Sequence, residues 1–288
     1  MEIKAKKLFI TGIIGIMLCL MGCNNEQTVD SEKDFSTKDI SAIMIDTASW
    51  NLKIQPSSDD KIHVHYDGKV NENTDIQVSQ DDNELIIQQN TISSENIATQ
   101  FSFGETGKII LYIPKDTVIP LDINNGSGDI EIEAVHFSDF TMENDSGYIS
   151  MSESMMDNLK IGSSTGDIKI TEGSCPDLKI ETKSAYVTIK NLVIQKSLIS
   201  TKSGEINMGG IQDYSSISLE TNSGDISLSH GTKPNDLSYD ISTGSDDVTM
   251  QLSDTESTID TEGCKQGIIG KGNSSLSIMS DSGTVLIK

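Results

Sequence analysis

Residues 124–133 read NNGSGDIEIE, and nineteen residues later the chain reads ENDSGYISMS over 143–152. A further nineteen residues on, 162–171 read GSSTGDIKIT. In each case a small hydroxyl residue and a glycine precede an alternation of apolar and polar residues. With the glycine as reference, the repeat runs through Gly128, Gly147, Gly166, Ala185, Gly204 and Gly224, then less regularly through Asp246, Gly267 and Gly283.

Each repeat holds two short segments in which every second residue is apolar. Around Gly166 these are Leu159 and Ile161 before the glycine, and Ile168 and Ile170 after it. A period of two places alternate side chains on opposite faces of a β-strand, whereas a helix needs a period of 3.6. Each repeat is therefore predicted to be two strands joined by a corner.

A single such unit cannot bury its apolar face, but stacked copies share a continuous core. We therefore predict an all-β fold in which residues 116–288 form a right-handed parallel β-solenoid, with roughly nine coils of about 19 residues each. Residues 40–115 alternate without the fixed interval, and we expect them to form an N-terminal β capping region that covers the first coil. Within that region, residues 90–107 are predicted to be an exposed excursion.

The corner itself is predicted to be architectural. Glycine adopts backbone conformations that cost other residues energy, so we expect it where the chain turns between two strands. The hydroxyl residues that precede it would stack as a ladder along one edge. Ala185 indicates that glycine is not required at every level.

The charge of the chain argues against one class of partner. The formal net charge is −23, and the sequence contains no arginine. An acidic surface repels a polyanion, and arginine is the usual residue for bidentate phosphate recognition, so we expect no nucleic-acid binding. The acidity is expected to keep a surface protein soluble, with cation binding as the alternative.

The N-terminus predicts secretion and a lipid anchor. Residues 1–22 combine lysines with a short uncharged apolar run, as a signal peptide does. Leu20 to Cys23 resembles the lipobox of bacterial lipoproteins, which implies that Cys23 receives a diacylglycerol after cleavage. Residues 23–39 are polar and are predicted to be a flexible tether. The expected location is the bacterial cell envelope, outside the cytoplasm, with the lipid inserted in the membrane.

Two cysteines remain in the expected mature domain, Cys175 and Cys264. The repeat places them about five coils apart, roughly 24 Å at the spacing of neighbouring strands, which is too far for a disulfide. We expect two unpaired thiols.

Three features of the sequence resemble those of a known protein family. These are the set of N-terminal strands, the segment Ile113-Pro114-Lys115, and the SG[DE]I units that recur to the end of the chain. Together they resemble the bacterial DUF4097 family of candidate adhesins over residues 40–288. The resemblance implies a β-helical, envelope-associated protein with no assigned enzymatic activity, and it supplies no catalytic residues.

Two motifs are compatible with a functional site, one catalytic and one metal-binding, but their positions in the chain favour a structural interpretation. Residues 162–166, GSSTG, match the G-x-S-x-G nucleophile elbow, but that motif needs a strand-to-helix turn and here lies between two predicted strands. His63 and His65 share one face of a predicted strand, a spacing compatible with two metal ligands. Because no further ligand accompanies them in sequence, we favour a solvent-facing pair on an edge strand.

Acidic residues follow the corner glycine at most levels. The column reads Asp129, Tyr148, Asp167, Tyr186, Glu205, Asp225 and Asp247. Tyrosine separates the first acids, whereas Glu205, Asp225 and Asp247 are predicted to occupy consecutive levels, where oxygen ligands could hold calcium. A solvated acidic edge is the favoured interpretation, and we expect no other cofactor.

We predict that the protein is not an enzyme. The favoured function is a lipid-anchored cell-surface protein that presents its solenoid for binding or adhesion to a protein or polysaccharide. The alternative is an envelope regulator that senses or holds a membrane-protein partner. A carbohydrate-active enzyme would need a cleft with a convergent acid and base, which the sequence does not indicate.

Overall fold

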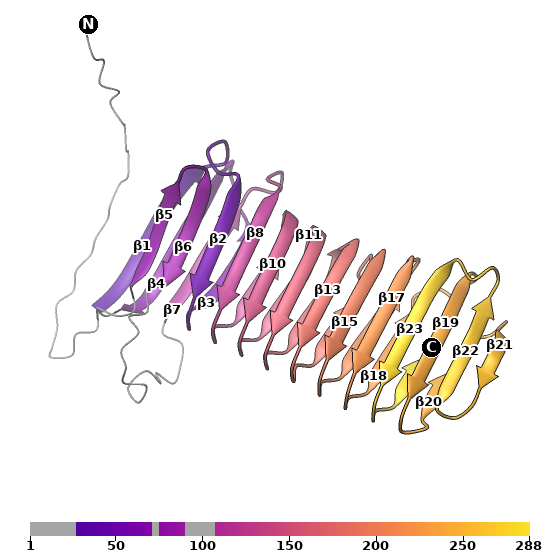
Figure 1. Cartoon of the computed structure of the whole chain (residues 1–288). Coiled ribbons are helices and arrows are strands. Elements are labelled where there is room, and N and C mark those ends of the chain that lie inside the picture. The colour runs from indigo at the N-terminus through magenta and orange to yellow at the C-terminus, as the bar shows by residue number, and fades with distance from the viewer. Residues whose placement is uncertain (1–26, 71–74, 90–106) are drawn as a thin grey trace, which may run out of the picture.

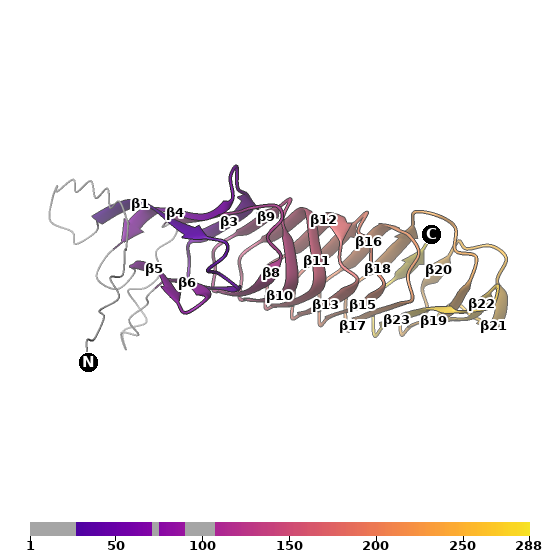
Figure 2. The same cartoon turned by 90° about the horizontal axis from the view of Figure 1, so that it is seen from above.

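The computed structural model describes residues 27–70, 75–89 and 107–288. Seen from above, the strands form two long faces with the apolar core between them (Figure 2). Along each face the strands lie side by side in one elongated row (Figure 1). This arrangement confirms the predicted all-β fold and its parallel solenoid.

The central levels follow the 19-residue interval. Their strands are β8 (Ile119–Asn125), β9 (Ile130–Glu133), β10 (His136–Asn144), β11 (Ile149–Ser163), β12 (Ile168–Ser174), β13 (Asp177–Thr182), β14 (Val187–Lys190), β15 (Lys196–Thr201), β16 (Ile206–Ile211), β17 (Ser216–Thr221) and β18 (Ile226–His230). Ile149 pairs with Ile168, Ile168 with Val187, and Val187 with Ile206, always in parallel. The repeat in the sequence is therefore the hydrogen-bonded register of the fold.

The N-terminal strands continue the same stack in a different order. They are β1 (Gln27–Ser36), β2 (Ala42–Thr47), β3 (Asn51–Pro56), β4 (Lys61–Val70), β5 (Ile76–Asp81), β6 (Glu84–Gln89) and β7 (Gly107–Ile113). β2 and β3 pair in parallel with β8 and β9, and β6 and β7 pair in parallel with the outer sides of β2 and β3. Residues 40–115, expected to be a separate cap, thus supply two levels of the solenoid.

The cap itself consists of antiparallel strands at the outer edges. β4 runs antiparallel to β7, β1 antiparallel to β4, and β5 antiparallel to β6. The tether expected over 23–39 is wrong for residues 27–36, which form β1. Its polar composition is compatible with a strand because only one face, including Val29 and Phe35, packs against the core. The excursion predicted at 90–107 falls on residues that, Gly107 apart, lie outside the described part of the chain.

The C-terminal strands also depart from sequence order. They are β19 (Leu237–Thr243), β20 (Val248–Met250), β21 (Glu256–Asp260), β22 (Cys264–Ile269), β23 (Ser274–Ser280) and β24 (Val285–Ile287). β23 lies between β17 and β19, and β24 lies between β18 and β20. Figure 1 shows the yellow β23 inserted between orange strands. The chain therefore leaves one level empty after β18 and fills it last.

This insertion corrects two predictions. Gly267, expected at a corner, lies in β22, which pairs antiparallel with β19 and β21. Residues 116–288 supply eight stacked levels to the first face, rather than about nine coils in sequence order. These are β8, β10, β11, β13, β15, β17, β23 and β19, and β2 and β6 add two further levels at the N-terminal end.

Most corner glycines fit a tight space rather than an unusual backbone conformation, and the corner at Ala185 is the level that holds a buried methyl group. Among the described residues with positive φ, none is a corner glycine. Instead, a Cβ added to Gly147 would collide with the carbonyl oxygen of Gly128, and a Cβ on Gly166 would collide with that of Gly147. Each corner thus lies directly on the backbone of the level before it. The predicted importance of the corner is right, but the predicted reason is wrong.

A ladder of buried polar side chains lies inside the corner, three residues before the glycine position. Asn125 Nδ2 donates to the Gly128 carbonyl at 2.7 Å and to Asn144 Oδ1 at 2.6 Å, while Thr47 Oγ1 donates to Asn125 Oδ1 at 2.9 Å. The hydroxyl residues expected to form the ladder are mostly exposed. Ser127 donates to the Ala48 carbonyl of the neighbouring level at 3.3 Å. The buried ladder satisfies polar groups that the tight corner would otherwise leave unpaired.

A second corner, at the other end of the coil, was missed by the sequence analysis. It places one residue in the left-handed region at each level, with φ between 50° and 70°. These residues recur every 19 positions: Ala134, Glu153, Glu172, Asn191 and Gly210. Only Asn191 and Gly210 are residue types that favour this conformation, so composition gave little signal.

The close approach at the corner predicts the effect of a single methyl group. We expect Gly147→Ala to lower the free energy of unfolding by about 1–3 kcal/mol, the usual cost of inserting a methyl group into a packed interior. Chemical denaturation followed by circular dichroism measures the change. Gly209→Ala is the matched control, because its Cβ would come no closer than 3.4 Å to the Ser229 hydroxyl. Equal stability of the two variants would contradict this account of the corner.

Candidate functional site

The GSSTG segment forms a corner between two strands. Ser163 is buried, and its hydroxyl donates to the Gly166 carbonyl at 3.0 Å. Ser164, the serine in the nucleophile position of the motif, is half-buried and accepts a hydrogen bond from Lys183 Nζ at 3.1 Å. An ammonium group donates hydrogen bonds and cannot remove a proton, and strand β12 rather than a helix follows. The segment has the structural role that its register predicts.

The aspartates after the corner glycine bond to the backbone of the next level. Asp129 Oδ1 accepts the amide of Tyr148 at 2.8 Å, and Asp167 Oδ1 accepts that of Tyr186 at 2.9 Å. Asp225 Oδ1 accepts the amide of Thr284 at 2.8 Å. Such charge-assisted bonds are stronger than neutral ones. The acid in SG[DE]I therefore joins successive levels.

The consecutive acidic levels that the calcium alternative required are not formed. Val285 pairs with Ile226 on one side and Val248 on the other, so Thr284 lies between Asp225 and Asp247. Glu205, Asp225 and Asp247 thus do not occupy consecutive levels, as the calcium hypothesis required. The placement of these three acids on consecutive levels was wrong because the last strands are inserted out of order.

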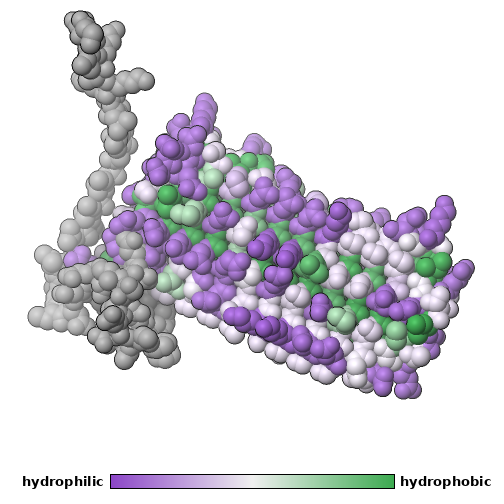
Figure 3. Space-filling view, in the orientation of Figure 1, coloured by the Kyte–Doolittle hydropathy of each residue, from purple (hydrophilic) through white to green (hydrophobic). Residues whose placement is uncertain are grey.

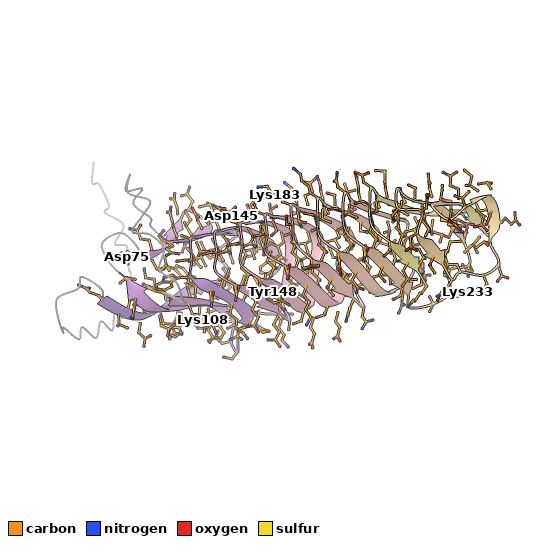
Figure 4. The ribbon with its side chains drawn as sticks, turned by 90° about the horizontal axis from the view of Figure 1, so that it is seen from below. Asp75, Lys108, Asp145, Tyr148, Lys183 and Lys233 are labelled. Atoms are coloured by element: carbon orange, nitrogen blue, oxygen red, sulfur yellow. The ribbon has the colours of Figure 1, made fainter. Side chains whose placement is uncertain are left out.

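Two exposed tyrosines lie in this same column on the second face. Tyr148 is 41% exposed and Tyr186 is 53% exposed. They belong to the levels of β11 and β14, with Asp167 of the β12 level between them, so their backbones are about 9.6 Å apart at the usual strand spacing. Figure 4 shows Tyr148 on the opposite side of the molecule from Asp145 and Lys183. Sequence analysis noted these tyrosines only as spacers between acids.

The first face carries a shallow hollow of about 490 Å³ across β10 to β17. Lys160, Lys179 and Lys196 line it, together with Leu198, which is 42% exposed. Figure 3 views this face and shows hydrophobic residues broken up by hydrophilic ones along its length. The hollow is open, and Asp139 and Asp177 line it beside the lysines.

His63 and His65 do lie on one outward face, but β4 is not an edge strand. β1 pairs with β4 on the side away from β7 and brings carboxylates to both imidazoles. His63 Nδ1 lies 2.8 Å from Asp34 Oδ1, and its Nε2 lies 2.8 Å from Asp59 Oδ1. His65 Nε2 lies 2.9 Å from Asp30 Oδ1.

The carboxylates alter the protonation of His63. Partial burial favours the neutral ring, but hydrogen bonds to Asp34 and Asp59 outweigh it and raise the pKa of His63 above its ordinary value. The backbone amide of Lys61 and the imidazole of His63 lower the pKa of Asp59 to about 2. The sequence could not indicate this group, because Asp34 lies on a segment interpreted as a tether.

Both remaining cysteines are free, as predicted. Cys175 lies just before β13, and β22, which begins at Cys264, is the fifth strand onward from β13 across the first face. Burial raises the pKa of the Cys175 thiol to about 12, so this thiol stays protonated and unreactive at neutral pH.

Comparisons with known proteins bear on the fold as a whole. The Toastrack DUF4097 family matches residues 40–288. The chain belongs to this family. No curated protein matches its sequence.

Several solved structures resemble this Toastrack protein at low identity. A candidate adhesin from Parabacteroides merdae is 13% identical with a TM-score of 0.47, covering 90% of this chain and 96% of its own. A candidate adhesin from Parabacteroides distasonis is 14% identical with a TM-score of 0.47, covering 90% and 94%. A candidate lipid-binding protein from the same species is 16% identical with a TM-score of 0.42, covering 93% and 98%.

Within the described residues, no helix has the length and apolar character needed to cross a bilayer. Residues 1–26, which include the predicted signal peptide and Cys23, lie outside those residues.

The raised pKa of His63 predicts a pH-dependent contribution to stability. A group with a raised folded pKa contributes fully below its unfolded value, about 6.5, and loses this contribution as the pH rises through the folded pKa. In EDTA, the melting temperature of His63→Gln should therefore lie furthest below that of the unmodified protein under mildly acidic conditions. The difference should shrink above neutral pH.

His136→Gln is the control, because His136 Nε2 lies 3.7 Å from the Asp157 carboxylate, beyond hydrogen-bond distance. Thermal unfolding of the three proteins at several pH values decides the matter. A difference for His63→Gln that grows with rising pH would contradict the assignment.

Proposed function

We propose that this Toastrack protein is a non-enzymatic, lipid-anchored bacterial surface protein that binds an extended polysaccharide along its second face. The observation that carries the proposal is the exposed pair Tyr148 and Tyr186, two levels apart in one column. Tyrosine offers an apolar ring and a polar hydroxyl, which suits a ligand that is partly apolar and partly wet. Two exposed tyrosines whose backbones lie about 9.6 Å apart along one column fit a polymer better than a compact ligand.

The charge of the column narrows the ligand class. Asp129, Asp167 and Glu205 lie beside the tyrosines, and the chain carries a formal net charge of −23. Carboxylates accept hydrogen bonds from sugar hydroxyls and repel anionic polymers. We therefore favour a neutral polysaccharide over an acidic one.

The local chemistry of the face supports binding rather than catalysis. Acid–base catalysis needs an acid and a base that converge on one reacting bond. In the tyrosine column, Asp129 and Asp167 each direct an oxygen to a backbone amide of the next level. A carboxylate held in that way is suited to fixing the stack and presenting its second oxygen.

Attachment through Cys23 would place the N-terminal cap near the membrane. Strand β1 begins at Gln27, only four residues after Cys23. The levels that carry Tyr148 and Tyr186 lie further along the stack, beyond those of β6, β2 and β8. The proposed binding face would then be presented away from the lipid.

Substitution of the tyrosines tests the binding role. Tyr148→Ala and Tyr186→Ala should each weaken binding to a neutral cell-wall or capsular polysaccharide about tenfold, since truncating an important interface residue costs more than about 1 kcal/mol. Glycan arrays and titration against isolated polysaccharides measure the effect. Leu198→Ala is the control, because it removes an exposed apolar side chain from the opposite face.

Unchanged binding by the double tyrosine variant would exclude this face. If crosslinking in cells instead captured one specific membrane protein, and no polysaccharide bound, the regulatory alternative would replace the proposal.

The lipid anchor has a separate test. Cys23→Ala should abolish incorporation of labelled fatty acid and shift the protein from the membrane fraction to the soluble fraction, because no other residue of the motif can carry the lipid. Cys19→Ala, in the predicted signal peptide, is the matched control and should retain the label. Persistent labelling of Cys23→Ala would contradict the assignment.

A further inference from the structure

The antiparallel pairing of β1 with β4 gathers acidic and imidazole side chains on one outer surface. Asp34 pairs with His63, and Glu32 pairs with His65. The alternation along β1 directs Asp30, Glu32 and Asp34 outward, away from the side that packs against the core. This arrangement lies at the N-terminal end of the solenoid, on the outermost strands of the second face.

Three of these side chains can reach a single point. His63 Nδ1 lies 2.8 Å from Asp34 Oδ1 and 3.9 Å from Glu32 Oε1. One ligand atom from each of Glu32, Asp34 and His63 lies within 4.8 Å of the other two. Separations of this size permit one ion to bind all three atoms at about 2.0–2.2 Å after small side-chain rotations.

The other nitrogen of His63 has the partner that a metal-bound imidazole usually has. His63 Nε2 lies 2.8 Å from Asp59 Oδ1. Asp59 is itself fixed, because its Oδ1 accepts the amide of Lys61 at 2.9 Å and the hydroxyl of Ser57 at 3.1 Å. A carboxylate that accepts Nε2–H orients the ring and makes Nδ1 a better ligand. This support is independent of the two carboxylates on β1.

We propose that Glu32, Asp34 and His63 form a binding site for a divalent transition-metal ion such as Zn²⁺. Imidazole nitrogen favours zinc and other late first-row transition metals, such as copper and nickel, over calcium and magnesium, which prefer sites made of oxygen alone. The three protein ligands leave the remaining coordination positions to water. Asp59 acts as the positioning residue for His63.

A metal ion at this site competes with a proton for His63 Nδ1. Without metal, Nδ1 lies 2.8 Å from Asp34 Oδ1 and Nε2 lies 2.8 Å from Asp59 Oδ1. The ion takes the lone pair of Nδ1, while Nε2–H is bonded to Asp59. Binding therefore weakens as the pH falls. Because two ligands belong to β1 and one to β4, the ion also joins these two strands of the cap.

Calorimetry with Zn²⁺ tests the proposal on the purified full-length chain after treatment with EDTA. The expected result is one saturable site per chain, with an affinity that falls as the pH is lowered. Glu32→Gln and Asp34→Asn alter exposed carboxylates and should each weaken Zn²⁺ binding at least tenfold, and so should His63→Gln. His136→Gln is the control and should bind as the unmodified chain does.

Two further measurements make the outcome decisive. Equal melting temperatures of Glu32→Gln and the unmodified chain in EDTA would show that the variant is folded. Added Zn²⁺ should then raise the melting temperature of the unmodified chain and leave that of Glu32→Gln unchanged. Co²⁺ in place of Zn²⁺ should give a visible spectrum that is lost in His63→Gln. The proposal is overturned if the chain binds no Zn²⁺ saturably, or if the variants at Glu32, Asp34 and His63 bind it as well as the control.

Discussion

The whole structure depends on how closely one corner can approach the next. At the Ser-Gly corner, the glycine of one level lies against the carbonyl oxygen of the level before it, so closely that a single added Cβ would collide with it. This contact keeps the strands on both faces within hydrogen-bonding distance, because the corner joins them. The buried ladder from Thr47 through Asn125 and Asn144 then supplies hydrogen bonds to polar groups enclosed by the corner.

The outer surface follows from the same constraint. Because the register is fixed at every level, side chains at equivalent positions of successive levels form columns. Polar and aromatic groups are therefore aligned along the surface of the stack instead of being gathered in a cleft. The aspartates that accept amides from the next level, and the tyrosines between them, are one such column. The cluster around His63 arises differently, where β1 and β4 end the regular stack with antiparallel pairing.

The sequence was sufficient for the repeating part of the fold. Hydrophobic alternation at a fixed interval specifies which residues pair, and Ile149, Ile168 and Val187 stack as that interval predicts. It was insufficient wherever the chain leaves the stack and returns, because pairing between distant strands has no local signature. Two such distant pairings were not predicted. One is the level that the last strands insert between Asp225 and Asp247, and the other is the pairing of residues 27–36 with β4.

The two candidate sites differ in the same way, because one lies in the repeat and the other at the irregular N-terminal end. Tyr148 and Tyr186 are two repeats apart, so their alignment could be read from the sequence, although their exposure could not. The environment of His63 could not be predicted, because Glu32, Asp34 and Asp59 come from segments whose spacing carries no period. The alignment of side chains within the repeat could be predicted from the sequence, whereas the grouping of side chains at the ends of the solenoid could not.

The late insertion of β23 and β24 determines when the molecule can be completed. Ile217 has its parallel partner in Leu276, 59 residues further along the chain, while Tyr239 pairs with the other side of the same Leu276. During synthesis, the edges of β17 and β18 therefore stay open until residues 274–287 have emerged. The solenoid cannot be finished coil by coil from one end, and loss of its last residues would leave a gap inside the stack where a simple solenoid would only become shorter.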